Sequence, residues 1–508
     1  MNAETIVVGA GSAGAVIAAR GTERSDLEVL LLEAGPDYHD LEQLPADLRD
    51  GTRNSMRSHD WRYRHRPLAG QVLFDFPRGR LVGGSSAVNT CIALRGHAYD
   101  YDEWAAMGLT EWSFDACLPA FKRLERDLDF GDAEWHGNSG PIPVRRHPRS
   151  ELVPWQAAFV DACLGMGFPS CPDHNAPNST GIGPSPMNKI AGVRQSAARC
   201  YLTAAVRARK NLGIRARTLV RRVLFDGLRV RGVEVEDDAG RVETIGARRV
   251  ILAGGAIATP GILLRSGVGP RRSVERLGVD LVADVPAVAA RLLDHPGAAF
   301  FLVPRPGVSV PTHLIQTMLS FTSAGSPYPN DMKLQAGSFV PLPRNLGVVP
   351  LVTIMCGVGK PRGHGRLEIT SADPRALPRI ESELLHHPVD KAAAVEAMEL
   401  AWLCATSKEM RGLASFFFPG ERTMSKRSSI AEWIVKACDS GYHPCGTVPM
   451  GLDSDDDAAV DAHGRVRGVS GLFVADASIM PTIPSANTNF PTLMIGERFG
   501  EWLREGAL

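Results

Sequence analysis

The chain has 508 residues, of which 44% are hydrophobic and 22% charged, and its 56 basic and 56 acidic residues give a formal net charge of zero. This length and composition are typical of a globular protein with several domains or one large interleaved fold, and they exclude a disordered chain and a coiled coil. The absence of a basic excess also argues against nucleic acid as a partner.

The nine cysteines are scattered and form no Cys-x-x-Cys pair. This pattern favours a reducing compartment over a disulfide framework and offers no zinc site. The acidic run at 453–457 lacks the glycine and glutamate of a calcium loop. No stretch approaches 18 consecutive apolar residues, and the N-terminus lacks the basic start of a signal peptide. We therefore predict a cytoplasmic protein with no membrane span and no bound metal.

The first predicted elements form a dinucleotide site. Residues 5–8 are a β-branched run that predicts a buried parallel strand, and residues 9–14 follow with the spacing G-x-G-x-x-G at the start of a helical run. In this arrangement the first glycine makes a tight turn, the second lets the backbone approach a pyrophosphate, and the third packs the helix on the strand. The helix N-terminus presents free N–H groups to the phosphates.

A second predicted strand, residues 28–32, leads to Glu33, which lies 19 residues after Gly14. A carboxylate at this spacing commonly binds the ribose hydroxyls. The strand, glycine turn, helix and acid together predict an adenine dinucleotide site, without separating NAD from FAD. Its expected residues are Gly9, Gly11, Ser12, Ala13, Gly14, Glu33 and Ala34.

A second glycine cluster occupies residues 79–89, which read Gly-Arg-Leu-Val-Gly-Gly-Ser-Ser-Ala-Val-Asn. Two adjacent glycines beside two serines make a loop whose backbone can lie against a flat ligand or phosphates. The flanking apolar residues predict that this loop is buried.

With this segment the chain resembles the glucose–methanol–choline (GMC) family of FAD oxidoreductases. The first family motif extends from residue 79 to 102, and the second covers residues 255–269. Residues 441–447, 473–481 and 487–492 are similar to the family's catalytic-histidine, flavin-ribityl and second active-site segments. One departure is Val-Ala-Ala-Arg-Leu-Leu-Asp-His-Pro at 288–296, where the family often has Val-Gly-x-Asn-Leu-x-Asp-His-Pro. The conformation of this loop is therefore left open.

The resemblance implies an α/β fold (α+β overall), in which a Rossmann-like FAD-binding domain is interleaved with a substrate domain built on a large antiparallel sheet. We expect the FAD-binding domain to comprise residues 1–148, 190–294 and 440–508, and the substrate-binding domain to comprise 149–189 and 295–439. Strands are predicted at 213–225, 228–236, 249–253 and within 297–358, a helix at 389–407, and a loop at the Pro-rich stretch 341–350.

The resemblance also implies non-covalent FAD, because Val88 stands where some members have a histidine linked to the flavin. Val220 would hold the adenine through its backbone, Trp61 would lie near the flavin, and Asp476 would hydrogen-bond the ribityl chain or pyrophosphate. A helix beginning near Pro491 would direct its N-terminus at the flavin pyrimidine and stabilise negative charge there. The cofactor-binding residues expected in addition to the dinucleotide turn are Trp61, Arg80, Val82, Gly83, Gly84, Ser85, Asn89, Thr90, Cys91, Ile92, Val220, Ala253, Tyr442, Asp476, Ala477, Asn487 and Thr488.

The expected chemistry is the removal of a proton and a hydride from an alcohol, with flavin N5 as the hydride acceptor. His443 is the expected base, because a neutral imidazole accepts a proton at pH 7. From the residues alone a His-Pro pair is more often structural, and it is the resemblance that makes His443 catalytic. Asn487 would hydrogen-bond the substrate oxygen and orient it. These residues predict FAD-dependent oxidation of a primary alcohol to the aldehyde.

Several alternatives stay open. A flavin-containing lyase of the same family, of the hydroxynitrile-lyase type, would carry out no net oxidation. A flavin-binding protein without catalysis and a nicotinamide enzyme are weaker alternatives. The segments in 297–358 are mostly apolar and carry no charged cluster, which favours a neutral alcohol over a quaternary amine or an acid. Oxygen, a quinone or a redox carrier could accept the electrons, and the oligomeric state is open.

Overall fold

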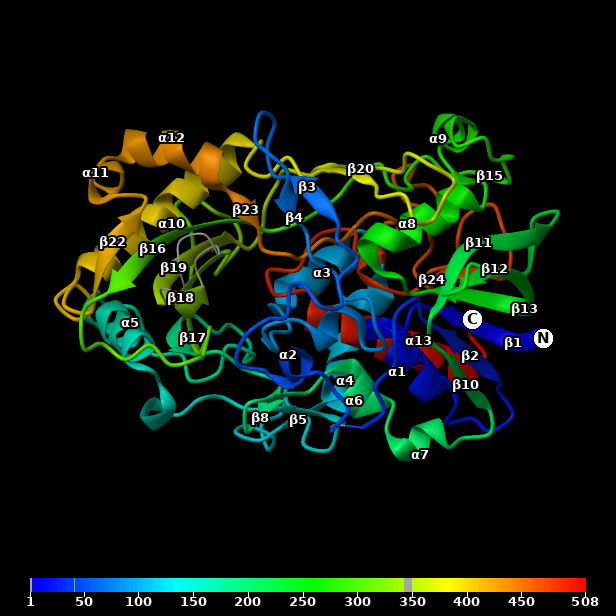
Figure 1. Cartoon of the computed structure of the whole chain (residues 1–508), viewed down its shortest axis with the longest axis horizontal. Coiled ribbons are helices and arrows are strands. Elements are labelled where there is room, and N and C mark those ends of the chain that lie inside the picture. Colours follow the sequence, from blue (N-terminus) through cyan, green and yellow to red (C-terminus); the bar gives the residue numbers. More distant parts are fainter. Residues whose placement is uncertain (1, 41, 342–349) are drawn as a thin grey trace.

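The computed structural model of the chain describes residues 2–40, 42–341 and 350–508. Two large sheets lie at opposite ends of the view in Figure 1, and both termini lie beside the first of them. This mixed architecture, with a parallel sheet and a separate antiparallel sheet, confirms the predicted fold class. The expected loop at 341–350 lies almost entirely outside the described residues.

The first sheet is built around the predicted dinucleotide strand. Five of its strands run parallel, in the order β10 (Leu212–Arg215), β2 (Val29–Leu32), β1 (Asn2–Val8), β13 (Val242–Leu252) and β24 (Leu472–Val474). The N-terminal half of β13 continues into an antiparallel extension with β12 (Arg229–Asp237) and β11 (Thr218–Asp226). The strand expected at 249–253 is therefore the buried second half of a longer strand.

The strand predicted at 213–225 is wrong as a single element. Strand β10 ends at Arg215 and β11 begins at Thr218, and between them Arg217 has a positive φ of 53°. A left-handed residue cannot continue an extended strand, so the chain turns there. As a result β10 pairs with β2 in parallel, whereas β11 pairs with β12 antiparallel.

Two helices far apart in the chain pack on this sheet at close range. Helix α1 (Ser12–Gly21) follows β1, and α13 (Asn489–Glu505) lies against it. A Cβ at Gly496 would lie 2.9 Å from the carbonyl oxygen of Ala13, so glycine is required for this approach. Helix α13 begins two residues before Pro491, slightly earlier than predicted. The contact joins the C-terminal segment to the dinucleotide turn.

The second sheet is fully antiparallel, as expected for the substrate domain. Helices α5 (Pro154–Gly165) and α10 (Pro388–Thr406) pack on one of its faces, and α12 (Arg427–Ala437) packs on α10. Helix α10 confirms the helix predicted at 389–407. The strand order is β22 (Ala414–Phe418), β16 (Pro296–Pro304), β19 (Pro350–Val358), β18 (Met332–Pro341), β17 (Thr317–Phe321) and β7 (Gly181–Pro184), with β23 (Asp439–Ser440) also paired to β16.

A small sheet links segments that were expected in different domains. Strands β3 (Arg64–Arg66) and β4 (Phe74–Asp75) pair with β20 (Arg366–Glu368) and β21 (Arg379–Glu381). The exact domain bounds stay a prediction. The other elements are α2 (Ala46–Arg49), α3 (Ala98–Ala106), α4 (Phe114–Leu124), β5 (Glu125–Asp127), β6 (Ile142–Val144), β8 (Lys189–Ile190), β9 (Val193–Arg194), α6 (Ala197–Tyr201), α7 (Ala204–Arg207), α8 (Gly255–Arg265), β14 (Val268–Gly269), α9 (Arg271–Arg276), β15 (Ala283–Asp284), α11 (Glu421–Met424), and the 3₁₀ turns η1 (Gly84–Ala87), η2 (Thr110–Trp112), η3 (Arg149–Glu151) and η5 (Ala477–Ile479).

The loop at 288–296 keeps its turn without the glycine that was expected there. Ala289 adopts a positive φ of 63°, and its N–H donates to the carbonyl of Thr447 at 2.8 Å. Arg291 donates to the carbonyl oxygens of Gly446 and Pro481 at 3.2 and 2.8 Å. The departure from the family pattern therefore leaves the loop bound to the C-terminal segment.

All nine cysteines are buried and none is in a disulfide. Within the described residues, no helix combines the length and the apolar character that a membrane crossing requires.

Candidate active site

A cavity of about 2210 Å³ separates the first sheet from the second. Ligand pockets usually have volumes of about 300–1,000 Å³, so this cavity has room for a dinucleotide together with a small substrate. Its walls come from the β1–α1 turn, the second glycine cluster, the N-terminus of α13 and strands β16, β18 and β19. The cavity-facing side of these three strands is called the roof below.

The three glycines of the dinucleotide turn have different structural causes. Gly9 has φ +96°, and a Cβ there would lie 2.5 Å from the carbonyl oxygen of Ala253. A Cβ at Gly14 would overlap the carbonyl oxygen of Gly9, which explains the close packing of helix on strand. A Cβ at Gly11 would meet no atom closer than 3.9 Å, and Gly11 lines the cavity. Packing within the protein therefore does not require glycine at Gly11, whereas a ligand close to the backbone does.

The two glycine clusters form one surface. A Cβ at Gly84 would lie 2.7 Å from the Cα of Gly11, and the N–H of Gly83 donates to the carbonyl of Ala10 at 2.7 Å. Both Gly83 and Gly84 have positive φ. The second cluster was predicted to be a buried loop, and the structure confirms this burial.

Glu33 lies at the cavity wall behind this surface. Its carboxylate accepts hydrogen bonds from the N–H groups of Ala10 at 3.0 Å and Gly35 at 2.9 Å. Burial raises the pKa of Glu33 to about 7, although the two backbone hydrogen bonds oppose the shift. Each carboxylate oxygen retains a lone pair that a ribose hydroxyl could use.

Most of the residues predicted for the cofactor line this cavity. Four do not, namely Gly14, Val82, Gly83 and Cys91, which lie behind the wall. The residues that do are Gly9, Gly11, Ser12, Ala13, Glu33, Ala34, Trp61, Arg80, Gly84, Ser85, Asn89, Thr90, Ile92, Val220, Ala253, Tyr442, Asp476, Ala477, Asn487 and Thr488. Their assignment to FAD stays a prediction.

The carboxylate of Asp476 is fully occupied by protein groups. One oxygen accepts from the N–H of Gly255 at 2.8 Å and the hydroxyl of Thr259 at 2.6 Å, and the other accepts from the N–H and hydroxyl of Ser478. Two acceptor sites per oxygen are therefore filled. A contact from Asp476 to a ribityl chain would have to use its backbone.

Asn489 supplies an unsatisfied donor at the cavity wall. Its Oδ1 accepts from the hydroxyl of Ser12 at 2.8 Å, but its buried Nδ2 has no hydrogen-bond partner. A buried unpaired donor is costly, so the position calls for an acceptor from a ligand. Together with Gly11, this atom shows that the cradle fits a bound cofactor.

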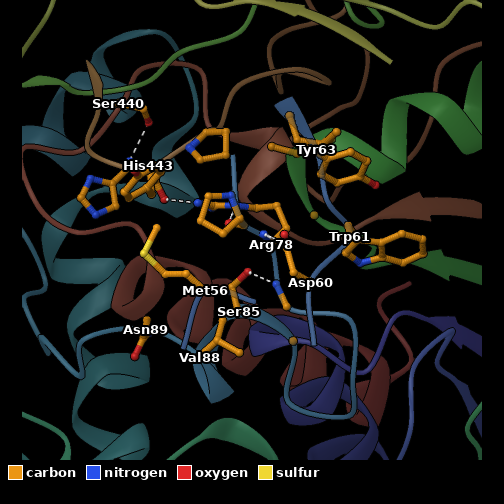
Figure 2. Close-up of a pocket in the computed structure, with 18 of the residues that line it drawn as sticks. Met56, Asp60, Trp61, Tyr63, Arg78, Ser85, Val88, Asn89, Ser440 and His443 are labelled. Atoms are coloured by element: carbon orange, nitrogen blue, oxygen red, sulfur yellow. Dashed lines mark hydrogen bonds between the residues drawn. The ribbon is translucent and has the colours of Figure 1, made fainter. Parts of the chain in front are cut away.

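His443 and Asn487 meet at the wall below the roof. Asn487 Nδ2 lies 2.9 Å from Nε2 of His443, and both residues line the cavity. The other ring nitrogen of His443, Nδ1, lies 2.9 Å from Nδ1 of His295. In Figure 2, His443 lies at one side of the pocket and Trp61 at the other.

The contacts of His295 determine where the protons lie on both histidines. Nε2 of His295 lies 3.0 Å from the carbonyl oxygens of Gly359 and Pro484, which only accept hydrogen bonds, so it carries a proton. Burial, with the charge of Lys333, lowers the pKa of His295 to about 3, so the ring is neutral and its Nδ1 is bare. His443 must then donate from Nδ1, which leaves its own Nε2 bare at the cavity.

Asp294 sets the relative position of the two rings. One of its carboxylate oxygens accepts from the backbone N–H of His295 at 2.8 Å and from that of His443 at 2.9 Å. The other oxygen accepts from the hydroxyl of Ser440. Burial raises the pKa of Asp294, while the hydrogen bonds from Ser440 and His443 oppose the shift. A single buried carboxylate thus joins two segments that are 148 residues apart.

The environment keeps His443 neutral. Burial is the largest cause that lowers the pKa of His443 well below 6.5, followed by the nearby His295, Arg78 and Lys333. Arg78 also donates to the carbonyl of Tyr442 at 2.8 Å, and Tyr442 has a positive φ of 63°. The segment that carries His443 is therefore held in an uncommon backbone conformation beside the cavity.

Four residues of this site were not predicted from the sequence, namely Asp294, His295, Arg78 and Lys333. Asp294 and His295 belong to the Asp-His-Pro end of the segment at 288–296. That segment was considered only for the glycine and asparagine that it lacks. No local signal marks Arg78 or Lys333, because each reaches the cavity only through the pairing of its strand or loop.

Away from the cavity, Glu125, Asp127 and His136 lie close enough to hold a metal ion. Arg95 Nη2 lies 2.7 Å from Glu125, and Arg146 Nη1 lies 2.7 Å from Asp127. These arginines already supply the positive charge that a metal would bring. We therefore describe the cluster as a buried ion-pair network.

Comparison with known proteins identifies related sequences and structures. Residues 3–297 and 361–496 match the two family models described as GMC oxidoreductase. The chain is 34% identical over 528 residues to 5-(hydroxymethyl)furfural oxidase of Methylovorus sp. (strain MP688), covering 98% of this chain and 97% of that protein. It is 31% identical to the oxygen-dependent choline dehydrogenase of Photobacterium profundum, covering 97% and 91%. The crystal structure of pyridoxine 4-oxidase from Mesorbium loti has a TM-score of 0.90 at 30% identity, covering 98% and 99%.

Proposed function

Because the chain belongs to the GMC oxidoreductase family, we propose that it oxidises a primary alcohol to the aldehyde with FAD as the hydride acceptor. The protein is an oxidoreductase, and its relatives act on CH–OH groups. The observation that carries the specific proposal is the unprotonated Nε2 of His443 beside the amide of Asn487 at the cavity wall.

Individual residues at the cavity wall support FAD as the cofactor. Gly11 would let the pyrophosphate approach the backbone, and Asn489 Nδ2 would find an acceptor on the cofactor. Val88 lines the cavity and offers no nucleophilic atom, which supports non-covalent attachment. The N-terminus of α13 faces the cavity and would stabilise negative charge on the cofactor. Bound FAD supplies the acceptor for the hydride.

The chain's own residues handle the proton. An alcohol hydroxyl would replace the direct hydrogen bond between Asn487 Nδ2 and His443 Nε2. Its oxygen would then donate its proton to Nε2 and accept a hydrogen bond from Nδ2 of the amide. His443 then becomes positively charged, and its Nδ1 proton remains bonded to Nδ1 of His295. Asn487 is uncharged at every pH, so the proton has a single acceptor in this pair. With the hydride accepted by the bound FAD, the products would be an aldehyde, the reduced cofactor and a protonated His443.

The finer assignments follow from the relatives. Two of these relatives are oxidases and a third is an oxygen-dependent dehydrogenase, and we propose oxygen as the electron acceptor of this protein as well. A cytoplasmic location and the expected domain bounds stay predictions. The expected neutral substrate is not part of this proposal, because the charged Lys333 lies on the cavity wall.

An anaerobic titration tests the proposal. Purified holoenzyme would be mixed with a panel of primary alcohols while its visible flavin bands are recorded, and air would then be admitted. We expect one alcohol class to bleach the bands and air to restore them. His443→Asn should bind FAD but reduce it about 10²- to 10⁴-fold more slowly, the usual contribution of a general base. If no alcohol bleaches the bound flavin and the protein cleaves a cyanohydrin instead, the proposed oxidation is wrong and the protein is a lyase.

A further inference from the structure

Lys333 is the one charged side chain that β16, β18 and β19 place on the cavity wall among the described residues. It lies on β18, and its ammonium donates to the carbonyl oxygen of Ser485. That hydrogen bond uses one of three donors on the ammonium. Burial lowers the pKa of Lys333 to about 8, so the group remains charged at pH 7.

No acidic side chain neutralises this charge. Lys333 forms no ion pair within residues 2–40, 42–341 and 350–508, and the remaining positions contain no Asp or Glu. Asp100 attracts it from a distance but is already bound to Lys360 at 3.3 Å and to the N–H and hydroxyl of Ser485. A buried cation without a partner is unfavourable, so its place on a cavity wall calls for an anionic ligand.

The roof leaves open space beside this charge. Lys333 is paired across the sheet with Gly357, and Gly357 with Gly297 on the next strand. A Cβ at Gly357 would meet no atom within 4 Å, and all three residues line the cavity. Two strand spacings separate Lys333 from Gly297, or about 10 Å. The missing side chain at Gly357 therefore leaves space on the cavity wall between Lys333 and Gly297, which lies two residues after His295.

The ammonium also lies close to the catalytic pair. Ser485, to which Lys333 is bonded, precedes Asn487 by two residues, so at most about 7 Å of backbone separates them. A substrate the size of one substituted ring could therefore present its hydroxyl to His443 and a second group to Lys333. The roof residue Met355 and the nearby cavity residue Ile315 are apolar and suit the body of such a molecule.

We propose that Lys333 binds a carboxylate of the substrate, and that the enzyme acts on alcohols that carry a carboxylate at the far end of a ring or short chain. This inference rests on the proposed alcohol oxidation. It replaces the neutral alcohol that the apolar roof suggested, and it excludes quaternary ammonium alcohols, because Lys333 would repel them.

The test compares matched substrates. The 2-, 3- and 4-(hydroxymethyl)benzoates would be compared with the corresponding methylbenzyl alcohols, which have the same hydroxyl and no charge, and with choline. We expect kcat/KM of the best benzoate to exceed that of its methyl partner by about 10- to 100-fold, the range for a hydrogen bond to a charged group. Choline should give no flavin reduction.

Variants separate this role from a structural one. Lys333→Gln can still donate to Ser485 but carries no charge, and it should abolish the preference for the benzoate mainly through KM. Lys333→Arg should retain a preference. Lys436→Gln removes an exposed lysine at the rim of the cavity and should leave the ratio at its wild-type value. Inhibition of the wild type by benzoate, and not by benzamide, gives a second readout that needs no variant.

The outcomes are distinct. Equal kcat/KM for charged and uncharged partners in the wild type would overturn the inference while leaving alcohol oxidation intact. A Lys333→Gln variant that slows every alcohol by the same factor would assign the lysine to the cofactor or to Ser485 instead. If no alcohol reduces the flavin, the proposed function fails, and this inference fails with it.

Discussion

Replacing His295 tests the proton arrangement from which the mechanism follows. With His295 protonated on Nε2, the other tautomer of His443 would place two bare Nδ1 atoms 2.9 Å apart. A buried acceptor without a partner costs about 1–3 kcal/mol. At about 1.4 kcal/mol per factor of ten, the bond to His295 favours the reactive tautomer of His443 by about 5- to 140-fold. We expect His295→Leu to slow anaerobic flavin reduction by a factor in this range while FAD stays bound.

His295→Asn is the matched control. Both variants lose the proton donor to the carbonyl oxygens of Gly359 and Pro484, so both lose the same structural bonds. Only asparagine can place an oxygen near the former Nδ1 and accept from His443. Stopped-flow reduction should therefore be faster in the Asn variant than in the Leu variant. Equal rates in the two variants, or a wild-type rate in the Leu variant, would refute the reasoning.

Three further predictions follow from particular residues. Burial lowers the pKa of His443 well below 6.5, so kcat/KM for a neutral alcohol should be constant from pH 6.5 to about 8. It should fall only at lower pH, where His443 gains a proton. A fall in kcat/KM centred at pH 7 would contradict this prediction. Gly11→Ala should keep the melting temperature of the FAD-free protein but lose most of its FAD absorbance. Gly14→Ala should instead unfold at a lower temperature, because its new Cβ would overlap the carbonyl oxygen of Gly9. Equal FAD content in the wild type and Gly11→Ala would show that the pyrophosphate does not lie against Gly11. Ala289→Gly should raise the free energy of unfolding by about 0.5–1 kcal/mol, because a left-handed alanine is strained, and a destabilised variant in denaturant titration would show that the strain is compensated.

Local spacing was enough to predict the dinucleotide turn. The three glycines of residues 9–14 act within one strand–turn–helix unit, so their roles depend on neighbours that the sequence itself displays. The helix at 389–407 was predicted from its composition, which is also a local property of the sequence. By contrast, the strand expected at 213–225 is broken by the backbone conformation of Arg217, which hydrophobic pattern does not encode.

The proposed base, His443, was named through a motif, but its protonation state could not be inferred from that motif. His443 and Asn487 were named from segments that resemble a family, and the structure places them 2.9 Å apart. The identity of the bare nitrogen depends on His295, on two carbonyl oxygens and on Asp294, which come from segments separated by up to 189 residues. Hydrogen bonds between such segments exist only after folding.

The sequence by itself therefore determined the family, the glycine turn and the two residues, His443 and Asn487, that we propose face the alcohol, because each depends on a short run of residues with a defined spacing. Only the tertiary structure decided which nitrogen of His443 is free of a proton and which charge lies on the roof of the cavity. Burial and strand pairing set both, since they remove His295 and Lys333 from bulk water and bring them to one wall from distant parts of the chain.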